Sequence, residues 1–239
     1  LTPAMVTIGA AAGFKMLPPS QAVAASSSRA PLHAAAALGF PADEDGAERY
    51  SASLLEELPV KAAIAVEKGG MNEKGVIHTS RGDNTTAPLA KADFLMRAAI
   101  RAGLPTVGIG DGGNEIGMGV IADELRGWLP YGVECRCGCG SGIVPATKTD
   151  HLVAAAVSNW GAYGLCAVLA LLAGRSEVLH GPELEKRILE ATVSAGLIDG
   201  GAGYVSGGAD ALPGRVHEAV VTMLGELVAK GLAQLGKQG

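Results

Sequence analysis

The sequence predicts an α/β fold in which helices cover both faces of a mostly parallel sheet, giving three layers in a single domain. Short apolar runs alternate with segments of helical periodicity, which is the pattern of parallel sheets. Hydrophobic residues make up 48% of the 239 residues and aromatic residues only 4%, which suits close packing of helices on such a sheet. No repeat or interdomain linker is evident, so we expect one domain over residues 1–239.

Strands are expected where short apolar runs end in polar loops. Residues 61–66 and 104–110 predict two buried strands. Residues 5–8 and 143–147 are further strand candidates. The apolar segment that begins at residue 150 is compatible with either a helix or a strand up to residue 157.

Helices are expected where apolar residues recur at helical spacing or where glycine and proline delimit a segment. The expected helices cover residues 32–38, 51–58, 90–102, 116–125, 162–173, 182–195 and 213–235. Residues 158–164 (Ser-Asn-Trp-Gly-Ala-Tyr-Gly) interrupt an apolar segment with two glycines, and we expect a functional corner there.

The most informative stretch is Gly-Ile-Gly-Asp-Gly-Gly-Asn-Glu-Ile-Gly-Met-Gly at residues 108–119, directly after the second strand. Six glycines surround Asp111, Asn114 and Glu115, and glycine lets the backbone pass close to a ligand. A tight turn in which Asp and Asn only cap a helix is the alternative. The Gly-x-Gly-x-x-Gly spacing is a weak dinucleotide signal, because Asp111 would face a pyrophosphate.

Carboxylates at the ends of neighbouring strands predict a site for a divalent cation, Mn²⁺ or Mg²⁺. Glu67 follows the first strand, and Asp111 and Glu115 follow the second. We expect these three acids to be catalytic and to bind the metal together with Asp199. Crowded carboxylates also raise one another's pKa, which suits acid–base work.

Polar side chains near these acids are candidates for holding a small acidic substrate. They are Asn72, His78, Arg81, Asn114, Asn159 and Trp160. Arg81 could bind a carboxylate through two hydrogen bonds. Alternatively, His78 is only a surface loop residue, and Trp160 is only a core residue.

Charge, the length of apolar runs and the absence of two motifs argue against several classes of partner and enzyme. A net charge of −5 without a basic stripe argues against nucleic acid, and residues 165–173 are too short an apolar run to span a membrane. Neither a Gly-Lys-Ser/Thr phosphate loop nor a Gly-x-Ser-x-Gly elbow is present. A homo-oligomer is compatible with the sequence.

Three of the four cysteines alternate in Cys-Arg-Cys-Gly-Cys at residues 135–139. This spacing matches neither a disulfide framework nor the paired spacing of a zinc ribbon, and we expect reduced thiols rather than a metal site. Reduced thiols place the protein in the cytoplasm, or in the mitochondrial matrix if its source is eukaryotic.

The motif at residues 108–119 resembles the signature of the D-glutamate cyclase family. The similarity extends to Val66-Glu67-Lys68, the loop at residues 72–75, the stretches 150–153 and 158–163, and the acidic loop from Asp199 to Asp210. It runs from about residue 62 to the C-terminus. The family's upstream strand and Thr-Asp-Gly-type loop are not found before Leu1, so we expect the chain to be truncated at that end.

The resemblance implies an α/β domain and the conversion of D-glutamate to 5-oxo-D-proline with loss of water. A cation bound by acids would neutralise the γ-carboxylate, and Glu67 would deprotonate the substrate ammonium. A metal-dependent phosphatase and a non-catalytic protein that binds a cation or small ligand are the alternatives.

Overall fold

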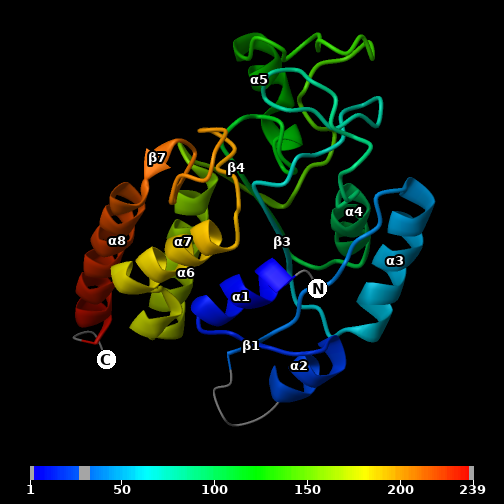
Figure 1. The fold of residues 1–239 in the computed structure, drawn as a ribbon. Helices are drawn as coiled ribbons and strands as arrows, with labels where there is room; N and C mark the ends of the chain where they lie inside the picture. The colour runs from blue at the N-terminus through cyan, green and yellow to red at the C-terminus, as the bar shows by residue number, and fades with distance from the viewer. Residues whose placement is uncertain (1–2, 27–32, 237–239) are drawn as a thin grey trace. The chain divides into compact units, whose positions relative to one another are not determined.

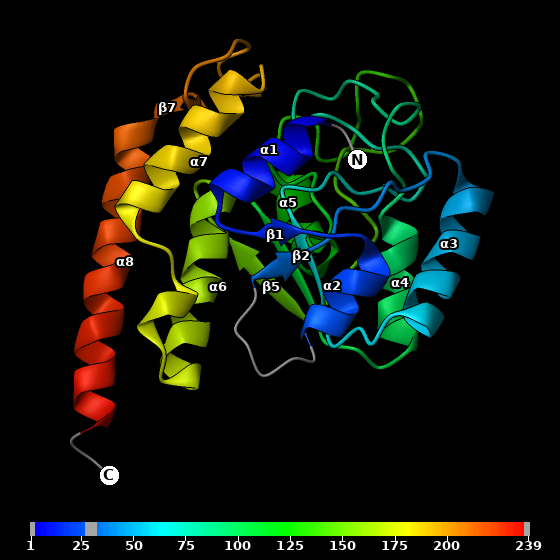
Figure 2. The same ribbon diagram turned by 60° about the horizontal axis from the view of Figure 1, so that its bottom comes forward.

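The computed structural model describes residues 3–26 and 33–236. Residues 40–162 form one compact unit, called here the sheet unit, and residues 1–39 with 163–239 form a second, the terminal unit. Figures 1 and 2 show their helices and strands from two directions. Helix α6 (Ser158–Ala173) begins in the sheet unit and ends in the terminal unit. A single domain over the whole chain stays a prediction.

Three parallel strands form the framework of the sheet unit. They are β3 (Ala63–Val66), β4 (Thr106–Gly110) and β5 (His151–Ala154), hydrogen-bonded in the order β3-β4-β5. Ile109 of β4 pairs with Val66 on one side and with Val153 on the other. Because the strands are parallel, their carboxyl ends meet at one edge of the sheet.

Helices cover both faces of this sheet. On one face, α4 (Asp93–Arg101) contributes Met96 to a buried cluster that includes Ala65 of β3. On the other face, a Cβ atom at Gly161 of α6 would lie 2.6 Å from Ile109 Cγ2 and 3.2 Å from Val153 Cγ1. Side chains of successive strand residues point to opposite faces, so Ala65 and Ile109 belong to different layers. The predicted α/β class with a parallel sheet is confirmed.

The strands predicted at residues 61–66 and 104–110 and the helix predicted at 90–102 are confirmed within a few residues. The segment from residue 150 to 157 contains a strand, β5, which was one of the two alternatives. No strand forms at residues 143–147, all of which the structure describes. There the chain runs as a loop, and the N–H of Ala146 donates to the carbonyl of Met71 at 2.8 Å.

Helix α3 (Glu44–Glu57) packs against α4, and the two lie side by side in both views (Figures 1 and 2). Asp43 caps its first turn by accepting a hydrogen bond from the N–H of Gly46 at 2.7 Å. Glu44 and Asp45 add negative charge at the same end, where the helix dipole favours it. The helix predicted at residues 51–58 therefore starts too late, because the polar capping residues lie ahead of its apolar pattern.

The helix expected to leave the glycine turn at residue 116 begins later. A 3₁₀ turn, η1 (Gly119–Ile121), leads into α5 (Ala122–Trp128). The N–H of Ile116 donates to Lys68 O at 2.8 Å, and that of Gly117 donates to Thr147 O at 3.1 Å. Gly117 also has a φ of 103°, far from the helical region. These residues join the turn to neighbouring loops and so cannot begin a helix.

The corner expected at residues 158–164 is also absent. These residues form the first turns of α6, which continues to Ala173 as predicted for residues 162–173. Asp111 accepts a hydrogen bond from the N–H of Ser158 at 2.8 Å, which stabilises the start of the helix despite its two glycines.

The terminal unit contains two helices that were predicted correctly. α7 (Pro182–Ser194) and α8 (Gly214–Leu235) lie side by side in both views (Figures 1 and 2). The remaining elements of this unit are α1 (Pro3–Ala11), β1 (Lys15–Met16), α2 (Pro19–Ser26), β2 (Ala34–Ala35), η2 (Ser176–Val178), β6 (Gly208–Ala209) and β7 (Leu212–Pro213). β1 pairs with β2 in parallel, and β6 pairs with β7 antiparallel.

Two predictions near the N-terminus are wrong. The strand expected at residues 5–8 is part of α1, which begins at Pro3, a residue suited to the first helical turn. The helix expected at residues 32–38 is replaced by β2 and loop over residues 33–38, while Leu32 lies outside the described residues. Across the described ranges, no helix is long and apolar enough to cross a membrane.

Alanine at two glycine positions should change stability in opposite directions. At Gly225 of α8 a Cβ would meet nothing within 4 Å, so Gly225→Ala should stabilise by about 0.5–1 kcal/mol through helix propensity. At Gly108 a Cβ would lie 2.5 Å from Ile116 O and 2.7 Å from Gly117 Cα, and Gly108→Ala should destabilise by about 1–3 kcal/mol. Urea unfolding of both variants beside the parent measures this. An unchanged midpoint for Gly108→Ala would contradict the close approach of β4 to the glycine turn.

Candidate functional site

Two acidic side chains meet at the carboxyl edge of the parallel sheet. Glu67 directly follows β3, and Asp111 directly follows β4. A carboxylate oxygen of each residue lies within 4.8 Å of one from the other. Glu67 is exposed and Asp111 is half-buried. The edge of the sheet therefore presents a pair of carboxylates that a ligand can reach.

Glu67 adopts a backbone conformation that is unusual for a residue with a side chain. Its φ is 51°, in the left-handed region, where non-glycine residues are rare and strained. Its N–H still donates to the carbonyl of Ile109 at 3.0 Å, which extends the β3–β4 ladder by one residue. Such strain is concentrated at functional sites, so this conformation supports a functional role for Glu67.

Asp111 is oriented by the start of helix α6. Its Oδ2 atom accepts hydrogen bonds from the N–H of Ser158 at 2.8 Å and from the Ser158 hydroxyl at 3.1 Å. These contacts use one of the two carboxylate oxygens and limit the rotation of the side chain. The start of α6 therefore fixes the orientation of the Asp111 side chain.

Glu115 is buried behind the same turn, with only 2% of its surface exposed. Its Oε1 atom accepts a hydrogen bond from the N–H of Gly112 at 2.8 Å, while Oε2 has no hydrogen-bond partner among the described residues. Burial raises the pKa of Glu115, and the nearby charge of Asp111 adds to this, although the Gly112 amide acts in the opposite direction. Glu115 is therefore buried, whereas Glu67 is exposed and Asp111 is half-buried.

Two predicted substrate-binding residues hold loops together. Asn114 donates from Nδ2 to the carbonyl of His78 at 2.7 Å. Asn72 is 2% exposed and accepts from the N–H groups of Lys74 and Val76 at 2.9 and 3.0 Å. It also donates to the carbonyl of Gly142 at 2.8 Å. Contact of either side chain with a substrate stays a prediction.

The other predicted substrate residues are more accessible. Arg81 is exposed in the loop after β3, and Asn159 and Trp160 are half-buried in the first turn of α6. Asn159 and Trp160 directly follow Ser158, the residue that binds Asp111. The predicted substrate contacts of these three residues remain predictions.

Asp199 belongs to the terminal unit, where it organises its own loop. Its carboxylate accepts hydrogen bonds from the N–H groups of Gly201, Ala202 and Ala211 and from the hydroxyl of Ser206. Burial opposes ionisation, but these donors lower the pKa of Asp199 below its ordinary value. Its predicted role as a metal ligand stays a prediction.

Sequence reasoning missed a buried acid below the sheet edge, Asp93. This residue is fully buried at the start of α4 and accepts a hydrogen bond from the hydroxyl of Thr147 at 2.6 Å and one from the N–H of Met71 at 3.1 Å. Burial raises the pKa of Asp93, and burial lowers the pKa of Lys68, which lies near enough to feel the Asp93 charge. An Asp in a first helical turn was the available signal, but acids are favoured there in any helix because of the helix dipole.

The structure places His78 with three cysteines. The Nε2 atom of His78 and the Sγ atoms of Cys135, Cys137 and Cys139 all lie within 4.8 Å of one another. All four cysteines of the chain are free, as expected. The His/Cys₃ group could bind a metal, which the cysteine spacing alone did not indicate, because the histidine lies 59 residues before Cys137.

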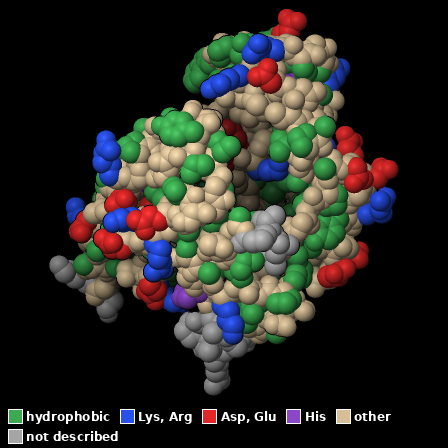
Figure 3. Space-filling model, viewed as in Figure 1, with side chains coloured by type: hydrophobic (Ala, Val, Ile, Leu, Met, Phe, Trp, Pro, Cys, Tyr) green, Lys and Arg blue, Asp and Glu red, His purple; other side chains and the backbone are tan. Residues whose placement is uncertain are grey.

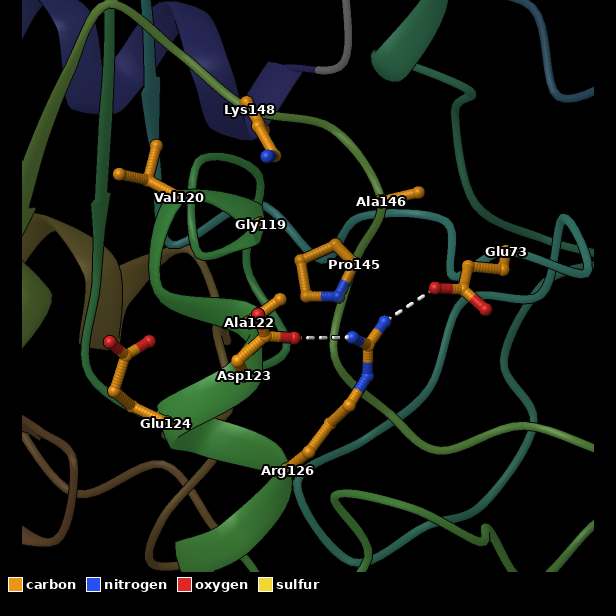
Figure 4. A pocket seen from close by; sticks show the side chains of 10 residues that line it. All are labelled: Glu73, Gly119, Val120, Ala122, Asp123, Glu124, Arg126, Pro145, Ala146 and Lys148. Atoms are coloured by element: carbon orange, nitrogen blue, oxygen red, sulfur yellow. Dashed lines mark hydrogen bonds and ion pairs between the residues drawn. The ribbon is translucent and has the colours of Figure 1, made fainter.

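A separate cavity of about 310 Å³ lies beside α5 (Figure 4). Arg126 points between Asp123 and Glu73 and forms an ion pair with each. The other lining residues are Gly119, Val120, Ala122, Glu124, Pro145, Ala146 and Lys148. None of the predicted site residues lines this cavity, and its arginine is already paired with acids.

On the face drawn in Figure 3, acidic and basic side chains are interspersed.

Comparison with known proteins agrees with these motifs. A family model described as D-glutamate cyclase-like, C-terminal, matches residues 5–225. The human protein named D-glutamate cyclase, mitochondrial, is 32% identical over 126 residues, which make up 52% of this chain and 19% of that protein. The chain therefore spans only a small part of this curated relative.

Replacing Glu115 should change how stability depends on pH. Because its folded-state pKa is raised, the stability it contributes is fully present below its ordinary pKa of 4.5 and is lost as pH rises through the folded value. Glu115→Gln mimics the protonated form, so its free energy of unfolding should rise relative to that of the parent as pH increases above about 4.5.

Denaturant unfolding at several pH values measures this difference. The exposed Glu124→Gln on α5 is the matched control, which removes a carboxylate from the surface instead of from the interior. A constant difference between Glu115→Gln and the parent would show that Glu115 is not held in a disfavoured ionised state.

Proposed function

Because the chain belongs to the D-glutamate cyclase-like, C-terminal family, we propose that it is a carbon–oxygen lyase of the D-glutamate cyclase type. In this proposal D-glutamate is converted to 5-oxo-D-proline with loss of water, assisted by Mn²⁺ or Mg²⁺. The supporting observation is the meeting of Glu67 and Asp111 at the carboxyl edge of the sheet, which is the usual position of ligand sites in open α/β folds.

The reaction requires that the charge of the γ-carboxylate be neutralised and that two protons be transferred. The α-amino nitrogen attacks the γ-carboxyl carbon, a C–N bond forms, and one γ-oxygen leaves as water. The ammonium group loses two protons in becoming an amide N–H, and the leaving oxygen gains two. The uncatalysed reaction is disfavoured because an ammonium is no nucleophile and a carboxylate is a poor electrophile.

The acidic pair suits a divalent cation. Two oxygens bound to an octahedral Mg²⁺ at about 2.1 Å are about 3–4 Å apart, which the separation of at most 4.8 Å between Glu67 and Asp111 allows. Two carboxylates completed by water and substrate are a common arrangement for this ion. When bound there, the cation would neutralise the substrate's γ-carboxylate and make its carbon more electrophilic.

The remaining roles in the proposed reaction are assigned to individual residues of the chain. Glu67 is exposed and accepts a proton from the substrate ammonium. Asp111, whose orientation is fixed by Ser158, would be the second carboxylate that holds the cation. Glu115 holds the turn through Gly112, and its predicted roles as a catalytic residue and metal ligand stay predictions. Arg81 or Asn159 would hold the α-carboxylate.

The proposed location of the protein in the cell rests only on the name of the human relative. The human protein is named as mitochondrial, which is in keeping with a mitochondrial matrix location for this chain if its source is eukaryotic. The small acidic substrate and the absence of nucleic-acid and membrane partners stay parts of the proposal.

Asp111→Asn should abolish most of the turnover without unfolding the protein. Asparagine retains an oxygen that can accept from Ser158 but lacks the charge, and the lost transition-state stabilisation of about 3 kcal/mol corresponds to about a hundredfold in rate. Production of 5-oxoproline from D-glutamate with Mn²⁺ or Mg²⁺ is measured, and thermal unfolding verifies the fold.

Asp123→Asn is the matched control for this experiment. Its side chain is 95% exposed beside the cavity of Figure 4 and should leave turnover unchanged. Equal activity of Asp111→Asn and the parent would refute the proposed site. Hydrolysis of phosphate esters by the parent, with no 5-oxoproline, would favour a phosphatase instead.

A further inference from the structure

We propose that His78, Cys135, Cys137 and Cys139 form a structural zinc site in the sheet unit. The four donor atoms come from two loops, one after β3 and one after α5. They converge on one point although neither loop contains a regular strand or helix at these residues. This site is separate from the Glu67–Asp111 pair and does not depend on the proposed reaction.

The distances suit a single tetrahedral ion. Cys135 Sγ lies 3.1 Å from Cys137 Sγ and 3.4 Å from Cys139 Sγ. His78 Nε2 lies 3.3 Å from Cys137 Sγ and 3.8 Å from Cys139 Sγ. Zinc bonds of about 2.3 Å to sulfur and about 2.0–2.1 Å to nitrogen separate tetrahedral ligands by about 3.6–3.8 Å. The two printed Sγ–Sγ distances would lengthen by up to about 0.7 Å on binding, and the two His78 distances would change by less than about 0.5 Å.

The local backbone is shaped to bring alternate cysteines together. In an extended chain, residues i and i+2 lie about 6.5–7 Å apart on the same side. Here Gly138 and Gly140 have φ values of 74° and 78°, which curl the loop and bring the sulfurs within contact distance. The N–H of Cys135 donates to the carbonyl of Ser141 at 3.0 Å and closes the curl.

The second loop is attached to the first by backbone and side-chain hydrogen bonds. The N–H of Arg136 donates to the carbonyl of Gly82 at 3.1 Å. Asn72 donates from Nδ2 to Cys139 Sγ at 3.4 Å, as outer residues do around metal-bound thiolates. The two loops run beside one another near α5 (Figure 1). The site would therefore fasten together two loops that lack regular secondary structure.

Two of the four donor residues are buried and lack strong partners for their donor atoms, while Cys139 is half-buried and Cys137 is exposed. His78 is 1% exposed and Cys135 is 7% exposed, and the Nε2 atom of His78 faces thiols, which are weak hydrogen-bond partners. A metal ion on Nε2 and the three sulfurs replaces these weak contacts with coordinate bonds. Three thiolates and one imidazole select zinc over Mg²⁺ or Mn²⁺, which prefer oxygen.

The site is structural because protein atoms fill all four positions. A catalytic zinc keeps one position for water or substrate, whereas a closed tetrahedron does not. Zinc competes with protons for thiol ligands, so affinity should increase as pH rises.

The metal content of the purified 239-residue chain tests the site directly. Elemental analysis should find one zinc per chain after expression in zinc-containing medium. Cobalt substituted for zinc should give the visible bands of a tetrahedral thiolate complex and a thiolate-to-metal band in the near ultraviolet. X-ray absorption should find sulfur at about 2.3 Å from the metal.

Variants assign the ligands. Cys139→Ser and His78→Ala should lose most of the zinc, and chelation of the parent should lower its unfolding temperature until zinc is restored. Cys166→Ser in α6 is the matched control and should keep one zinc, since Cys166 is a free cysteine outside the group.

Three results would overturn the proposal. They are a parent chain without zinc that gives no cobalt–thiolate spectrum, a disulfide among residues 135–139, and loss of zinc from Cys166→Ser to the same extent as from Cys139→Ser. If the ligand variants do not fold, the metal content and cobalt spectrum of the parent still decide the question.

Discussion

The parallel pairing of β3 with β4 is the constraint on which the candidate site depends. The ladder continues one residue past β3, because the N–H of Glu67 donates to the carbonyl of Ile109 at 3.0 Å. This bond keeps Glu67 beside Asp111 although Glu67 has a φ of 51°. Strain of this kind costs about 1–3 kcal/mol, and the surrounding sheet and turn must outweigh it.

Loops at the same edge connect this acidic pair with the cysteine cluster. Asn114, in the glycine turn, donates to the carbonyl of His78 and accepts from the N–H of Gly70 at 2.9 Å. A zinc ion that ordered His78 would thus also order the turn that carries Asp111. The proposed zinc site would then influence the proposed catalytic site through hydrogen bonds of the backbone and of a side-chain amide. The two sites would share no ligand.

Buried acids support the exposed ones. Glu115 and Asp93 both have a raised pKa, with burial as the main cause. Each accepts backbone hydrogen bonds, from Gly112 and Met71 respectively. A carboxyl group that is protonated more easily is less costly to bury than a full charge, so these residues can hold loops from inside the protein. The carboxylates that remain accessible are Glu67 and Asp111.

The sequence by itself determined the two strands, the helices at 182–195 and 213–235, and the placement of Glu67 and Asp111 after strands, because apolar runs and glycine turns are properties of neighbouring residues. The burial predicted for both strands holds for β4 but not for β3, in which Ile64 and Val66 are exposed. The helix starts at Glu44 and Ala122 were less predictable, since capping and loop hydrogen bonds decide them. Only the tertiary structure decided which distant groups meet. Asp111 lies 47 residues before Ser158, and His78 lies 59 before Cys137. Such pairs form because the sheet brings separate loops to one edge, and no local pattern encodes that path.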